Sequence, residues 1–124
     1  MAERPIFDGI NLVVRDMDAA VAFYTDVVGL TLIRRTGDGW AEFDSGTPVR
    51  LALHGAIHGS EPPPPGGAAV VFRVEDLDGS RRALEARGAP FDEHVGEVEG
   101  FARFATFRDP DGNAIQLIEY APRG

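Results

Sequence analysis

The sequence predicts an α+β protein built from two β-α-β-β-β modules in tandem. The main observation is an internal repeat: Val14-Arg15-Asp16-Met17-Asp18 is followed 60 residues later by Val74-Glu75-Asp76-Leu77-Asp78. In both copies an apolar stretch precedes the first Asp, and a glycine, Gly29 or Gly88, closes the helical stretch that follows. A repeat of this size indicates two similar structural units. A chain of 124 residues can hold two such half-size modules in one domain.

The elements of the first module, about residues 6–54, follow from local patterns. Alternating apolar residues predict a strand over 6–14, and Asp16 can cap the helix that comes next. Apolar residues at helical spacing from Met17 to Val28 predict one buried helix face, and Gly29 can end the helix in a left-handed conformation. Three strands are then expected, at 30–36, 40–44 and 49–53, with the turn Gly37-Asp38-Gly39 between the first two.

A proline-rich connector is expected over about residues 55–67, because neither a helix nor a central strand tolerates the run Pro62 to Pro65. The second module, about 68–120, repeats the plan. Its expected elements are a strand over 68–74, a helix from the Asp76 cap to Gly88, and strands over 90–94, 101–107 and 114–120. The turn Asp109-Pro110-Asp111-Gly112 separates the last two strands. We expect residues 1–124 to form a single domain.

Composition and charge argue against several classes of function. The chain has no cysteine, so it offers neither a disulfide framework nor a thiolate nucleophile. Its net charge of −8 argues against nucleic acid or an anionic membrane surface as a partner. No apolar run approaches the roughly 20 residues of a membrane-spanning helix, and no signal peptide is recognisable. A cytoplasmic location is therefore expected.

Two motifs resemble those of a known family. The first is Val13 to Asp18, followed by Ala22-Phe23-Tyr24 and Val28-Gly29-Leu30; the second is Phe107 to Asn113, followed by Gln116 to Glu119. Together they are similar to the signatures of the vicinal oxygen chelate (VOC) superfamily. That family includes glyoxalase I, extradiol dioxygenases, fosfomycin-modifying enzymes and bleomycin-resistance binding proteins. The resemblance implies that each module curls its mixed sheet into half of an open barrel. It also implies a homodimer that binds its ligand in a concave cleft.

The resemblance also implies four positions at which enzymes of this family bind a divalent metal, one on the first and one on the last strand of each module. In this sequence they fall on Gly9, Leu51, Ala69 and Gln116. Only Gln116 carries a donor atom of the kind such metals accept. A shift of one residue would place Arg50 or Ala52 at the second position, and neither is a useful ligand. We therefore expect no metal and no cofactor.

The side chains expected in the cleft suit reversible binding of an organic molecule. They are Asn11, Trp40, Glu42, Leu51, Arg73, Phe101, Arg103 and Gln116. His54 has the opposite strand parity to Leu51 and is expected to face away from the cleft. Other roles are open for Trp40 and Phe101, as core or dimer interface, and for Glu42 and Arg103, as a solvated edge or a cross-strand ion pair.

Three functions remain open from the sequence. The first is a metal-free protein that binds and sequesters a drug or natural product, as bleomycin-resistance proteins do. Its ligand would be aromatic or cationic, and Glu42 or Asp44 could meet a cationic group. The second is a cofactor-independent isomerase, cyclase or lyase in which Glu42, Asp44 or Tyr120 acts as acid or base. The third is a metal-dependent glyoxalase or dioxygenase with displaced ligands. We expect the first, and thus a binding protein rather than a standard metal-dependent enzyme.

Overall fold

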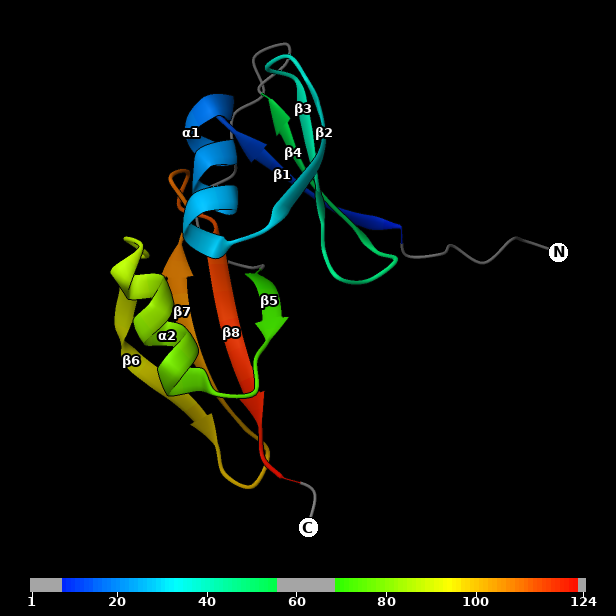
Figure 1. The fold of residues 1–124 in the computed structure, drawn as a ribbon. Helices are drawn as coiled ribbons and strands as arrows, with labels where there is room; N and C mark the ends of the chain where they lie inside the picture. The colour runs from blue at the N-terminus through cyan, green and yellow to red at the C-terminus, as the bar shows by residue number, and fades with distance from the viewer. Residues whose placement is uncertain (1–7, 56–68, 123–124) are drawn as a thin grey trace, which may run out of the picture. The chain divides into compact units, whose positions relative to one another are not determined.

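The computed structural model describes residues 8–55 and 69–122. The chain forms two compact units, and each contains one four-stranded sheet (Figure 1). The order β-α-β-β-β expected for both modules is confirmed. Within the described residues, neither α-helix is long and apolar enough to cross a membrane.

The first module starts with a strand and a composite helix. Its elements are β1 (Gly9–Val14), α1 (Met17–Ala22), the π-helical turn η1 (Phe23–Val28), β2 (Thr31–Thr36), β3 (Trp40–Asp44) and β4 (Arg50–Gly55). Gly29 ends the helical segment with a φ of 92°, as expected from its position. The strands lie in the order β1-β4-β3-β2. The sheet is mixed, because β1 runs parallel to β4 while the other pairs are antiparallel.

The second module repeats this arrangement. Its elements are β5 (Ala69–Arg73), α2 (Leu77–Ala86), β6 (Phe91–Val98), β7 (Ala102–Arg108) and β8 (Ala114–Tyr120). The strand order β5-β8-β7-β6 matches that of the first sheet, again with one parallel pair, β5 with β8. Strand β6 is longer than the expected 90–94 and contains a register shift between Phe91 and Val95. The proline-rich connector lies outside the described residues, except for Gly55, which ends β4.

Each copy of the repeated aspartate motif caps a helix and links that helix to its own sheet. The side chains of Asp16 and Asp76 accept hydrogen bonds of 3.1 Å from the backbone N–H groups of Ala19 and Gly79. Such an N-cap stabilises a helix by about 1 kcal/mol. The second Asp of each motif forms an ion pair with a strand arginine. These pairs join Asp18 to Arg35 on β2 at 2.6 Å and Asp78 to Arg103 on β7 at 3.1 Å.

The cores lie between each helix and the face of the sheet that it covers. Helix α1 packs on β3 and β4, and α2 packs on β7 and β8. The largest fully buried side chains come from the helices and these faces: Val14, Tyr24, Phe43, Leu53, Leu77, Phe107 and Ile115. Because one helix covers one face, the opposite face of each sheet contributes little to this core.

The turn before β8 is organised by Asp109, the one buried charged residue among the described positions. Its Oδ1 accepts hydrogen bonds from the backbone N–H groups of Asp111 and Asn113, at 2.9 and 2.8 Å. Its Oδ2 accepts a third bond from the Asn113 side chain at 2.8 Å. The carboxylate thus closes the turn that sets the start of β8.

We expect Asp109→Ala to lower the free energy of unfolding by about 2–4 kcal/mol, because it leaves two backbone donors without their acceptor. The control is Asp109→Asn, whose remaining amide oxygen can still accept from both backbone groups, and we expect a loss of about 1 kcal/mol. Urea denaturation followed by circular dichroism measures both values. Equal losses for the two variants would contradict this role of the carboxylate.

Candidate functional site

The first sheet presents a polar face opposite α1. The strand registers pair Gly9 with Arg50, Asn11 with Ala52, and Trp40 with His54. Paired residues point to the same side of a sheet, and alternate residues point to opposite sides. The residues that share this open face are therefore Gly9, Asn11, Val13, Trp40, Glu42, Arg50, Ala52 and His54.

Arg50 is the centre of a polar network on this face. Its guanidinium forms an ion pair with Asp8 and donates to Oδ1 of Asn11 from Nη2 at 3.3 Å. The guanidinium carbon also lies 5.7 Å from the centre of the Trp40 ring, a cation–π distance. Asn11 and Trp40, both expected in the ligand site, thus contact an arginine that the sequence-based prediction did not select.

Trp40 also organises its other neighbours. Its ring meets that of His54 edge-on, with 6.3 Å between centroids, and its Nε1 donates to Oε1 of Glu42 at 3.4 Å. Trp40, Glu42 and His54 are all half-buried. This end of the face therefore combines a flat aromatic surface with one carboxylate and one imidazole.

The second sheet presents a more apolar open face. Across β5, β8 and β7 the register forms one row of Arg73, Ile118 and Phe104, and a neighbouring row of Val71, Gln116 and Thr106. Gln116 is half-buried, and its Nε2 donates to the Thr106 hydroxyl at 3.2 Å. Arg73 is exposed. Two residues expected in the ligand site, Arg73 and Gln116, therefore share one face.

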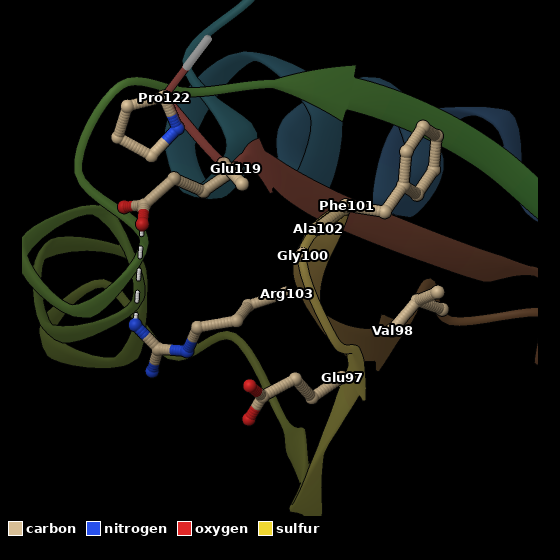
Figure 2. A pocket seen from close by; sticks show the side chains of 9 residues that line it. Glu97, Val98, Gly100, Phe101, Ala102, Arg103, Glu119 and Pro122 are labelled. Carbon is tan, nitrogen blue, oxygen red and sulfur yellow. Dashed lines mark ion pairs between the residues drawn. The ribbon is translucent and has the colours of Figure 1, made fainter. Parts of the chain in front are cut away.

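A pocket of about 180 Å³ lies at the β6–β7 end of this sheet (Figure 2). Phe101 and Arg103 both line it, but Val98 and Phe101 point away from the side occupied by Arg103, Glu97 and Glu119. Phe101 lies in the turn before β7, is 57% exposed, and meets the Tyr120 ring edge-on at 5.5 Å.

Arg103 lies on the helix-covered side of the second sheet, not with Gln116. It pairs across the strands with Glu119, and its guanidinium contacts Asp78 at 3.1 Å and Glu119 at 4.0 Å. The hydrogen bond to Asp78, aided by that carboxylate's charge, raises the pKa of Arg103. Oε2 of Glu119 also accepts from the backbone N–H of Leu77 at 2.7 Å. This network anchors the start of α2, so of the roles open from the sequence Arg103 has that of an ion-pair residue.

The prediction that Leu51 lies in the ligand site is wrong. Leu51 pairs with Ile10 and Phe43 on the helix-covered face and is 3% exposed. The expectation that His54 faces away from the ligand site is also wrong. His54 has the opposite parity to Leu51 and therefore shares the open face with Gly9. The equivalent of Gln116 in the first module is Ala52, because Gln116 pairs with Val71 as Ala52 pairs with Asn11.

Besides Glu42, the sequence offers Asp44 and Tyr120 as catalytic acids or bases. The structure gives little support for either role. Asp44 is exposed at the end of β3, and its Oδ1 accepts from the backbone N–H of Gly46 at 2.8 Å, which gives it a turn-forming role. Tyr120 lies at the end of β8, is 49% exposed and packs on Phe101.

The residues at the family's metal positions do not fit a metal. With Ala52 in place of Leu51, the set is Gly9, Ala52, Ala69 and Gln116, and it holds one amide as its only side-chain donor. Gly9 cannot simply be exchanged for a ligand: a Cβ there would lie 2.6 Å from the carbonyl oxygen of Arg50. Within residues 8–55 and 69–122, no three acidic or histidine side chains are grouped to hold a metal ion elsewhere.

Comparison with known proteins identifies the family of this chain. The family model of the Glyoxalase/Bleomycin resistance protein/Dioxygenase superfamily matches residues 6–117. The chain belongs to this superfamily, as the resemblance of its motifs implied.

Individual relatives differ in what they do. The chain is 27% identical to the lactoylglutathione lyase of Haemophilus influenzae, over 86% of each chain. A glyoxalase/bleomycin resistance protein/dioxygenase from Nocardioides superimposes with a TM-score of 0.80 at 29% identity, covering 100% of this chain and 89% of the other. TnmS3, an antibiotic-binding protein from Streptomyces sp. CB03234, superimposes with a TM-score of 0.74 at 28% identity, covering 98% and 99%.

We expect Gly9→His to destabilise the protein rather than to create a metal site. The added Cβ would push against the Arg50 backbone, and such overpacking costs about 1–3 kcal/mol. The matched control is Ala69→His, at the same place in the repeat, where a Cβ is already accommodated. Thermal unfolding with and without Ni²⁺ measures both variants. A Gly9→His protein that is as stable as Ala69→His and is further stabilised by Ni²⁺ would contradict this expectation.

Proposed function

We propose that this protein is a metal-independent binding protein for small aromatic molecules, of the bleomycin-resistance type. It would act by sequestering a drug or natural product, as a homodimer in the cytoplasm. The observation that carries the proposal is the replacement of ligand donors on both open faces: Gly9, Ala52 and Ala69 stand where metal-dependent relatives need donors. The similarity to the antibiotic-binding protein TnmS3 supports it.

The open faces supply what reversible binding of an aromatic molecule requires. Trp40 offers a flat ring at the first sheet, while Phe104 and Ile118 offer apolar surface at the second. Asn11, Arg73 and Gln116 are polar groups set into these surfaces. Apolar area with a few directed polar contacts is the usual composition of a small-molecule site.

The chain contains a built-in reporter for this function. Trp40 is its single tryptophan and lies on the proposed binding face. We expect titration with aromatic antibiotics, bleomycin among them, to change Trp40 fluorescence saturably and equally with or without excess EDTA. Absence of any binder in such a panel, together with metal-stimulated turnover of lactoylglutathione, would contradict the proposal.

Trp40→Ala should weaken binding of a compound found in this panel by about tenfold, because it removes the stacking surface. Calorimetry measures the affinity without the fluorescent reporter. Trp40→Phe is the control, since it keeps a flat ring and should retain most of the affinity. An unchanged affinity in Trp40→Ala would place the ligand elsewhere.

A cofactor-independent lyase or isomerase is the second candidate. Glu42 favours it, because this half-buried carboxylate lies on the open face and receives a hydrogen bond from Trp40. The similarity to a lactoylglutathione lyase is compatible with it. In that case the wild-type protein would form product, and Glu42→Gln would bind the ligand without forming product. A pure binding protein would form no product as wild type or as Glu42→Gln.

A further inference from the structure

We propose that Arg73 makes the open face of the second sheet a site for an anionic aromatic ligand, a carboxylate or sulfonate. This inference rests on the proposed binding function and deepens it by naming the chemical class of the ligand. Two observations carry it. The other arginines on strands of this sheet form ion pairs with aspartates whereas Arg73 has none in the described residues, and apolar and amide side chains lie beside Arg73.

Arg73 has a charge that the described part of the protein leaves without a partner. Its side chain is exposed and forms no hydrogen bond or ion pair with any residue within 8–55 and 69–122. The other arginines on strands of this sheet are paired, Arg103 with Asp78 and Arg108 with Asp92 at 3.6 Å. Strands β5, β7 and β8 place no carboxylate on the same face as Arg73, and Asp92 of β6 is paired with Arg108, which lies on that face. In a chain of net charge −8, this face is therefore locally cationic.

The surface beside Arg73 is apolar. Ile118 and Phe104 continue the row that starts at Arg73, and Val71 in the next row is 50% exposed. The Phe104 ring lies over Gly96 of β6, where a Cβ would come within 2.2 Å of the ring. Because Gly96 has no side chain, the ring can lie against the strand and leave a flat surface for an aromatic ligand.

A polar pair borders the same surface. Gln116 lies diagonally from Arg73, roughly 8 Å away for strands separated by about 4.8 Å with a rise of about 3.3 Å per residue. Its Nε2 bonds to Thr106, which leaves its Oε1 without a hydrogen bond among the described residues. A planar guanidinium binds a carboxylate or sulfonate through two parallel hydrogen bonds, and Gln116 can orient a second polar group of the ligand.

These observations favour an anionic ligand over the cationic one considered from the sequence. That alternative depended on Glu42 and Asp44. Glu42 already accepts from Trp40, and Asp44 accepts from the turn at Gly46. Arg73 has no such partner in the described residues, so an incoming anion would displace none of their side chains.

A pair of fluorescent probes that differ by one charged group tests this inference. The probes are 8-anilino-1-naphthalenesulfonate and its uncharged analogue N-phenyl-1-naphthylamine. We expect the wild-type protein to bind the sulfonate more tightly than the analogue. Arg73→Gln should weaken sulfonate binding by about five- to tenfold and change binding of the analogue by less than about twofold. Added NaCl should weaken only sulfonate binding.

The matched control is Arg82→Gln, which removes the same charge from an exposed position on α2, on the other side of the sheet. It should leave the affinity for both probes unchanged. Circular dichroism and thermal unfolding verify that both variants are folded.

Three outcomes would overturn the inference alone: an unchanged preference for the sulfonate in Arg73→Gln, an equal loss in Arg82→Gln, or a change of oligomeric state in Arg73→Gln without loss of probe binding. The last would mean that a second copy of the chain covers this face. If the wild-type protein binds neither probe and no compound of the antibiotic panel, the proposed binding function fails as well.

Discussion

The attachment of each helix to one face of its own sheet determines which side chains a ligand can reach. Buried apolar side chains between helix and sheet make this attachment, and the repeated aspartates assist it: Asp16 and Asp76 cap the helices, while Asp18 and Asp78 pair with strand arginines. The covered faces fill with apolar side chains, and the opposite faces remain open. The same attachment explains why Arg103, although it carries a charge beside a pocket, belongs to the scaffold and not to the proposed ligand site.

The two open faces have diverged although the scaffold beneath them is duplicated. On the first sheet, Arg50 is already paired with Asp8 and lies beside Trp40, so the charge is satisfied within the unit. On the second sheet, Arg73 lies in an apolar surface without such a pairing in the described residues. One unit therefore offers aromatic surface with a neutralised charge, and the other offers an available charge beside apolar surface. A duplicated module can in this way carry two chemically different surfaces.

The sequence was sufficient for the fold because its signals are local. Capping aspartates, helix-ending glycines and strand alternation act over a few residues, and the order of elements in both modules follows from them.

The identity of the open-face residues depends on strand register, which is set by pairings between residues far apart in the sequence. Leu51 was misplaced because its position was transferred by analogy with the family. The alternation of Leu51 and Leu53 with Arg50 and His54 shows which side is apolar, and this signal would have given the correct face. The contact between Arg50 and Asn11 could not be foreseen, because it joins strands 39 residues apart.

The close approach of Gly9 to Arg50 has a consequence for anyone who would redesign this scaffold as a metalloenzyme. In most such projects the backbone is accepted and donor side chains are added to it. Here the obstacle is the backbone itself, since the carbonyl oxygen of Arg50 lies only 2.6 Å from the position that the Cβ of any new side chain would take. A redesign must therefore include a shift of β1 away from β4 in addition to the new donor side chain.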